Sequence, residues 1–235
     1  MNMATILCIE SATPICSIAL VQNGVVIRLQ ETGLLQSHAA SLMEFIQQAL
    51  VAAGLTVAAI DAVAVSKGPG SYTGLRIGVS TAKGLCFALG KPLIGIGTLK
   101  SMAIGMLKTY QPTETNTLYC PMIDARRMEV YTALYTSTLT EVFQVSAKII
   151  DESSFSEVLQ NHTIVFAGDG SSKCRELLER HPNARFIDQE IVTAASMASL
   201  AHDAFTKGLF EDLAYFEPYY LKDFIAGKSF VKGLR

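Results

Sequence analysis

Carboxylate side chains stand at or near the ends of short apolar stretches that are typical of buried strands. Carboxylate oxygens bind magnesium, and magnesium in turn holds phosphate groups. A glycine on each side of Asp169 also permits a tight turn that a phosphate could approach. Acids at strand ends and such turns also occur for purely structural reasons. The residues of this candidate nucleotide cleft are Glu10, Ser11, Asp124, Gly168, Asp169 and Gly170.

The segment from Gly68 to Gly78 combines a flexible turn with the start of a helix. Gly68 and Gly70 flank Pro69, and glycine adopts backbone conformations that other residues avoid. Free N–H groups at the start of the following helix could receive an anion. The segment is not a P-loop, because no Gly-Lys-Ser or Gly-Lys-Thr closes it.

Small residues recur at regular spacing along the helix predicted after this turn. From the second glycine of the turn, glycine returns every four residues at Gly74 and Gly78, and Ala82 continues the row. Gly84 and Ala88 form a second small pair. Each interior glycine costs about 0.5–1 kcal/mol relative to alanine, so the row predicts close approach of another backbone. That neighbour could be the helix's own sheet, a second subunit or a ligand.

Composition excludes several classes of protein. Half of the 235 residues are apolar and 17% are charged, which favours a folded chain with a large core. A net charge of -2 provides no general attraction for nucleic acid. The five cysteines are widely spaced without a Cys-x-x-Cys pair, which argues against a disulfide framework or a zinc knuckle. No apolar run approaches the roughly 20 residues of a membrane span, and the N-terminus has no basic region, so we expect a cytoplasmic protein without membrane contact.

The first half of the chain alternates strands and helices after an initial hairpin. An Asn-Gly pair at Asn23 predicts the hairpin turn. Three strands followed by strand–helix units are typical of one lobe of an α/β, ribonuclease H-like, actin-like fold. We expect strands at 5–10, 15–21, 25–31, 62–66 and 93–97, and helices at 37–53, 72–89 and 98–110.

The second half predicts another lobe. A polar segment at 111–116 with a proline is the candidate hinge. We therefore predict a first lobe at 1–110, a smaller second lobe at 111–215 and a tail at 216–235 that packs back on the first lobe. We expect strands at 117–123, 129–135, 141–149 and 163–167, and helices at 153–160, 172–180 and 196–207.

The glycine-rich run at 68–78 resembles the signature of the bacterial TsaB (YeaZ) family, which usually has Phe where Tyr72 stands. Four further blocks match that family in the same order, and Glu10 replaces its usual Asp. The part at 141–215 matches only loosely. The matching blocks are 6–13, 83–95, 124–131 and 218–222.

The resemblance implies the two-lobed fold of acetate and sugar kinases, Hsp70 and actin (ASKHA). It implies a non-catalytic subunit that pairs with its catalytic paralogue TsaD and works with a small ATPase, TsaE. Together such proteins attach threonylcarbamoyl to adenosine next to the tRNA anticodon. The resemblance also implies contact with tRNA only through the complex, and a homodimer when TsaD is absent.

In this family the first two helices form the dimer surface, so the glycine row is predicted first as a docking face for a sister subunit. Catalytic paralogues bind a metal through His-x-x-x-His on the first helix, whereas here Leu42 stands four residues after His38. We therefore expect no metal site, and no cofactor beyond weak binding of ATP or ADP with magnesium. The predicted partner interface comprises His38, Leu42, Phe45, Ile46, Tyr72, Thr73, Gly74, Arg76, Ile77, Gly78, Thr81 and Ala82.

Two alternatives remain at this stage. The chain could act alone, as an actin-like ATP-binding enzyme or as a glycopeptidase-type metalloprotease.

Arg126 and Arg127 could position a partner or tRNA, or form a solvated turn. The basic tail could contact RNA weakly, or be a solvated end. Its basic residues are Lys222, Lys228, Lys232 and Arg235.

Overall fold

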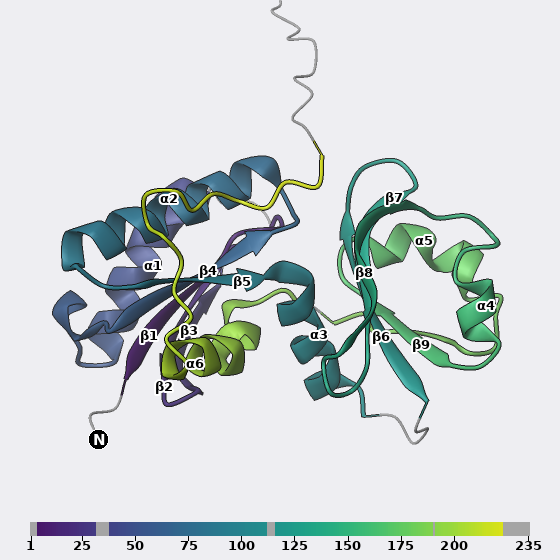
Figure 1. Cartoon of the computed structure of the whole chain (residues 1–235), viewed down its shortest axis with the longest axis horizontal. Helices are drawn as coiled ribbons and strands as arrows, with labels where there is room; N and C mark the ends of the chain where they lie inside the picture. The colour runs from purple at the N-terminus through teal and green to yellow at the C-terminus, as the bar shows by residue number, and fades with distance from the viewer. Residues whose placement is uncertain (1–3, 32–37, 112–115, 190, 223–235) are drawn as a thin grey trace, which may run out of the picture.

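The computed structural model describes residues 4–31, 38–111, 116–189 and 191–222, and the side chains of 38–41 lie outside this description. The described residues form two five-stranded sheets, each with helices on both faces (Figure 1). No helix among them is long and apolar enough to cross a membrane.

The first sheet has the order β3-β2-β1-β4-β5. Its first three strands are antiparallel, and β4 and β5 are parallel to β1. Asn23 and Gly24 both have positive φ, at 48° and 79°, and form the predicted hairpin turn. The strands are β1 (Thr5–Glu10), β2 (Ser17–Gln22), β3 (Val25–Glu31), β4 (Ala62–Gly68) and β5 (Leu93–Gly97).

Alternating side chains of β1 point to opposite faces of this sheet. Leu7 and Ile9 pack under α1 (His38–Ala52) and α2 (Tyr72–Leu89), which cover one face. Ile6 and Cys8 pack on the opposite face. All four side chains are buried, so β1 is the centre of the first lobe.

The opposite face of the first sheet is covered by a segment from late in the chain. The 3-10 helix η2 (Ala194–Met197) and α6 (Ala198–Thr206) pack there through small residues and Met197. This differs from the predicted lobe boundaries, which place both elements in the second lobe. An amphipathic helix shows in its sequence that it covers a sheet, but not which sheet.

The second sheet has the order β10-β9-β6-β7-β8. The helix α3 (Thr98–Thr109) covers one face with Leu99, Met102 and Met106, although the predicted boundaries place it in the first lobe. It lies between the two sheets (Figure 1). The opposite face carries α4 (Ser156–Leu159) and α5 (Ser171–Leu178). The strands are β6 (Thr117–Asp124), β7 (Glu129–Tyr135), β8 (Glu141–Ile149), β9 (Thr163–Ala167) and β10 (Ala184–Phe186).

Residues 209–222, here called the C-terminal strap, run across the first lobe beside α2 (Figure 1). The Glu211 N–H donates to the Leu93 carbonyl at 2.9 Å, and the Tyr219 N–H donates to the Lys67 carbonyl at 2.6 Å. At its end, Lys222 forms an ion pair with Glu129 at the start of β7. The strap therefore connects the two lobes.

The packing of η2 gives a testable prediction. Met197 is fully buried against the first sheet, so Met197→Ala should lower the free energy of unfolding by about 2–5 kcal/mol. Hydrogen exchange should accelerate most in β1 and β4. The matched variant Met122→Ala removes a fully buried methionine of the second sheet and should accelerate exchange in β9 instead. Equal effects of Met197→Ala on both sheets would contradict this assignment.

Candidate docking face and cleft residues

The glycine row of α2 packs against the loop that follows β1. A Cβ atom on Gly74 would lie 2.1 Å from the Ser11 carbonyl oxygen, and one on Gly78 would lie 2.1 Å from Ser11 Oγ. A Cβ atom on Gly70 would lie 2.5 Å from the Ala12 carbonyl oxygen. The close neighbour is thus a segment of the same chain, which corrects the prediction that this row is a docking face for another subunit.

Several other residues of the predicted interface also point inward. Phe45, Tyr72, Ile77 and Thr81 are half-buried, and Thr73 and Arg76 are exposed. The reason is that α1 and α2 are amphipathic and pack their apolar stripes on the sheet. The side chain of His38 lies outside the described residues. The predicted interface residues buried within the chain are Leu42, Ile46, Gly74, Gly78 and Ala82.

The outward surfaces of α1 and α2 carry apolar and small residues that the prediction omitted. Met43, Val51 and Phe87 have exposed fractions of 53%, 73% and 81%. Gly84 is also exposed, and a Cβ atom there would meet no atom of the described residues within 4 Å. We call this surface the outer face, and it comprises Met43, Val51, Thr73, Arg76, Ser80, Gly84, Phe87 and Ala88.

The candidate cleft residues of the first lobe are buried. Only 1% of Glu10 is exposed, and its carboxylate accepts a hydrogen bond from the Ala12 N–H at 2.8 Å. Ser11 lies beneath Gly78, and its N–H donates to Ser66 Oγ at 3.4 Å. The Glu10 carboxylate therefore closes the turn after β1, and the Ser11 side chain packs beneath α2.

The candidate cleft residues of the second lobe come together at the end of β6. The Asp124 N–H donates to Asp169 Oδ1 at 3.0 Å, and the Gly170 N–H donates to the Met122 carbonyl at 3.1 Å. Gly168 has φ 103°, and a Cβ atom on it would lie 2.3 Å from the Met122 carbonyl oxygen. The Gly-Asp-Gly turn thus packs directly on β6.

Asp124 is part of a local ionic network. Its carboxylate accepts hydrogen bonds from Lys173 Nζ and, at 2.7 Å, from the Arg126 N–H. Burial raises the pKa of Asp124, but these hydrogen bonds and the positive charges of Lys173 and Arg126 outweigh it and hold the pKa below its ordinary value. The carboxylate is therefore ionised and already occupied by cationic neighbours.

Arg126 and Arg127 lie in the turn between β6 and β7, both exposed and both with positive φ, at 72° and 50°. The Arg126 carbonyl accepts a hydrogen bond from the Glu129 N–H at 3.1 Å. The turn therefore ends at Glu129, which pairs with Lys222 at the end of the strap.

Histidine, cysteine and carboxylate side chains do not gather into groups of three or more that could hold a metal ion, within the described ranges. The cysteines are buried free thiols. Burial raises the pKa of Cys8 and, with smaller contributions from its neighbours, that of Cys120 to about 12, so these two thiols stay protonated and unreactive.

Replacing each of two glycines of α2 by alanine should change the free energy of unfolding in opposite directions. Gly74→Ala places a methyl group on the Ser11 backbone and should lower the free energy of unfolding by about 1–3 kcal/mol. Gly84→Ala meets open space and should raise it by about 0.5–1 kcal/mol. Denaturant unfolding of both variants measures this contrast, and effects of the same sign would refute it.

The network at Asp124 predicts a pH effect. A carboxyl whose pKa is depressed on folding stabilises the fold above its ordinary pKa of about 4, and this contribution is lost as pH falls through the depressed value. In Lys173→Met the pKa of Asp124 should rise, as followed by carboxyl NMR. The stability difference from the parent should shrink as pH falls below about 4. Lys222→Met, which removes a lysine bonded to Glu129, is the control and should leave Asp124 unchanged.

Comparisons with known proteins agree with this architecture. The family model described as TsaD, tRNA N6-adenosine threonylcarbamoyltransferase, matches residues 32–231. The Escherichia coli tRNA threonylcarbamoyladenosine biosynthesis protein TsaB is 30% identical over 95% of this chain and 97% of its own length. The solved structure of YeaZ from Pseudomonas aeruginosa superposes with a TM-score of 0.72, at 27% identity, over 93% of this chain and 100% of that chain.

A more distant neighbour shows the fold alone. Component A of (R)-2-hydroxyglutaryl-CoA dehydratase from Acidaminococcus fermentans has a TM-score of 0.51 at 10% identity, over 88% of this chain and 99% of that chain. The two lobes thus have the predicted actin-like fold. The chain therefore belongs to the family described by the TsaD model and, within it, to the TsaB (YeaZ) proteins of tRNA threonylcarbamoyladenosine biosynthesis.

Proposed function

We propose that this chain is a non-catalytic subunit that binds a TsaD-type paralogue through the outer face of α1 and α2. In this proposal the pair acts with a TsaE-type ATPase in threonylcarbamoylation of the adenosine next to the tRNA anticodon. The chain meets tRNA only within the complex and pairs with a second copy when the paralogue is absent. Membership in the family supports the pathway, and the outer face supports the mode of action.

Gly84 is the observation that carries the docking surface. An exposed glycine in the middle of a helix costs about 1 kcal/mol relative to alanine, and here no atom in the part of the chain that the structure describes uses the space. Ser80 and Ala88, four residues before and after Gly84, are also small and exposed. Phe87 lies beside this row, and its side chain is largely exposed. Such a surface suits a second helix that packs backbone to backbone, with Phe87 as an aromatic anchor.

The buried state of Glu10 and Ser11 supports the absence of catalysis by this chain. A phosphate-binding role would require these groups to face a ligand, whereas the Glu10 carboxylate bonds to its own turn and the Ser11 hydroxyl lies beneath Gly78. The alternative, an actin-like ATP-binding enzyme acting alone, draws on the cluster of Asp124 with Asp169. Steady ATP hydrolysis by the purified chain that is lost in Asp124→Ala would favour that alternative.

Gly84→Leu tests the proposed interface. The variant monomer should be as stable as the parent or more stable, by up to about 1 kcal/mol, because leucine favours the helix. Its leucine should nevertheless block close helix packing and abolish co-purification with the TsaD-type paralogue. Ser199→Leu places the same side chain at an exposed position of α6 and should still bind. Unchanged affinity of Gly84→Leu would refute the interface.

The pathway is tested in cells depleted of this protein. The parent chain and Ser199→Leu should restore the threonylcarbamoyl modification of tRNA, and Gly84→Leu should not. Restoration by Gly84→Leu would show that the outer face is dispensable. Failure of the parent chain to restore the modification would refute the assignment to this pathway.

A further inference from the structure

The turn between β6 and β7 holds two consecutive arginines in a backbone conformation that arginine rarely adopts. Arg126 and Arg127 have φ values of 72° and 50°. Two successive residues with positive φ are what a type I′ hairpin turn requires, and asparagine followed by glycine is favoured there. The hairpin between β2 and β3 has that favoured pair, Asn23 and Gly24, at φ 48° and 79°. The chain therefore builds one such turn from favoured residues and the other from strained ones.

The backbone of the arginine turn does not need these side chains. The Ala125 N–H donates to the Glu129 carbonyl at 3.1 Å, and the Glu129 N–H donates to the Arg126 carbonyl at 3.1 Å. Asparagine and glycine would keep both bonds. Arg126 and Arg127 are exposed, and neither guanidinium forms an ion pair or a hydrogen bond with a described residue. Because residues in such rare conformations gather at binding sites, the two guanidinium groups point to a ligand outside the chain.

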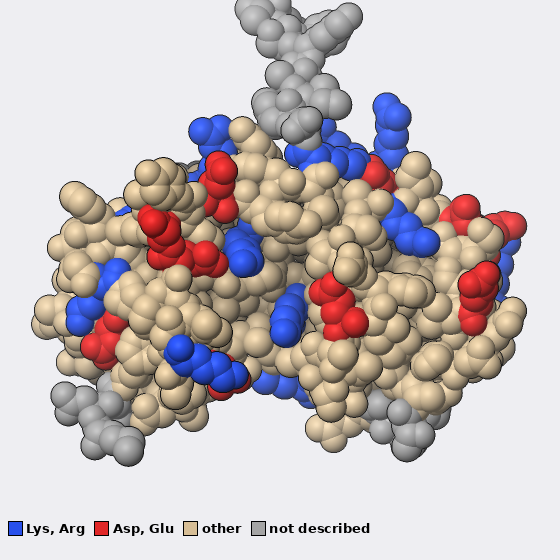
Figure 2. Space-filling view, viewed as in Figure 1, with Lys and Arg blue, Asp and Glu red and all other residues tan. Residues whose placement is uncertain are grey.

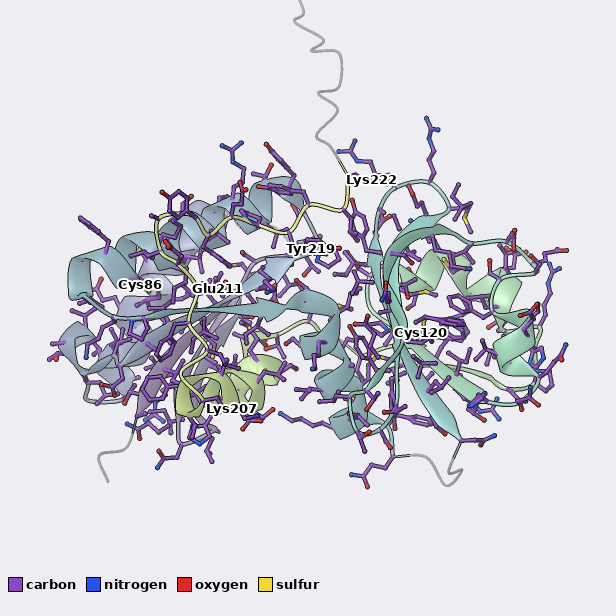
Figure 3. All side chains as sticks on the ribbon, viewed as in Figure 1. Cys86, Cys120, Lys207, Glu211, Tyr219 and Lys222 are labelled. Atoms are coloured by element: carbon purple, nitrogen blue, oxygen red, sulfur yellow. The ribbon has the colours of Figure 1, made fainter. Side chains whose placement is uncertain are left out.

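Two lysines from other parts of the chain meet the same turn. Lys173 of α5 donates to the Asp124 carboxylate and, at 2.7 Å, to the Glu129 carbonyl. Lys222, at the end of the strap, pairs with the Glu129 carboxylate (Figure 3). The third carboxylate here, that of Asp169, accepts a hydrogen bond from the Asp124 N–H. The carboxylates that flank the turn are thus paired with lysines, and with the arginines included the surplus charge is positive.

Basic side chains project at this edge of the molecule. Figure 2 shows Lys and Arg side chains along the upper edge, above β7 and beside the end of the strap. The net charge of the chain is -2, so a polyanion would be attracted to a local patch and not to the protein as a whole. We call this patch the basic turn, and it comprises Arg126, Arg127, Lys173 and Lys222.

We propose that the basic turn binds the phosphate backbone of tRNA in the assembled complex. A guanidinium holds a phosphate through two parallel hydrogen bonds, and such contacts fix the position of a nucleic acid without reading its sequence. That role suits a subunit without catalysis. The identity of the RNA rests on the proposed function. The basic turn itself lies on the second lobe, whereas the outer face lies on the first.

NMR titration of the full-length, isotope-labelled chain tests the contact without the complex. The probe is an anticodon stem-loop RNA at low salt, where phosphate contacts are strongest. It should shift the signals of Arg126 and Arg127 in a saturable way, and Gly84→Leu should give the same shifts. In the double variant Arg126→Asn/Arg127→Gly, the shifts at Lys173 and Lys222 should be lost and the melting temperature should rise. No saturable shift in the parent chain would overturn the proposal.

The affinity of the complex with the TsaD-type paralogue for tRNA, measured across a range of salt concentrations, tests the role. The double variant should bind tRNA about tenfold more weakly, and the salt dependence of log K should fall by about 1 for each lost phosphate contact. Arg180→Asn removes an exposed arginine of the same lobe, paired with Glu152, and should change neither quantity.

Unchanged affinity and salt dependence in the double variant would overturn the contact. Loss of its co-purification with the paralogue would also overturn it, because the partner would then be an acidic protein segment. If the parent chain itself fails to co-purify, the proposed function fails, and the titration of the isolated chain still decides whether the basic turn binds RNA.

Discussion

Close contact between α2 and the loop after β1 is the constraint on which the first lobe depends. Gly74 and Gly78 allow the helix backbone to lie directly on Ser11. The same approach lets the Ser71 N–H donate to the Ala12 carbonyl at 2.7 Å, which fixes the turn that begins at Gly68. With α2 in this position, Lys83 reaches the Phe216 carbonyl at 2.8 Å and holds the strap. One interlocked contact therefore orders the helix, the turn before it and the connection to the second lobe.

Much of the fold follows from local sequence signals, whereas the partners of its helices do not. The Asn-Gly turn, the buried strand β1 and the apolar spacing of α1 are decided by neighbouring residues, and they appear where predicted. The faces covered by α3 and α6 are decided by contacts between residues far apart in the chain. The short strand β10 (Ala184–Phe186) has too few residues to show a periodic pattern.

In the candidate site, too, local sequence signals predicted the backbone geometry but not the contacts between residues far apart in the chain. The glycine spacing correctly indicated close approach, but spacing cannot identify the neighbour, which is the chain's own loop. The surface that we propose for docking is marked in the sequence by the pair Gly84 and Ala88 with Phe87 between them, because an aromatic residue in that stripe has no sheet to pack on. Glu10 could not be placed from sequence, since a residue at a strand end can face a cleft or turn back into the fold.

Because η2 and α6 cover one face of the first sheet, they affect the order in which the two lobes fold during synthesis. During translation the strands of this sheet leave the ribosome early, and α1 and α2 can cover one face at once. The other face stays bare until residues 194–206 have emerged, after the whole second sheet has been made. The second lobe can thus complete its core before the first, and the nascent chain carries an uncovered apolar surface that chaperones would recognise for most of its elongation.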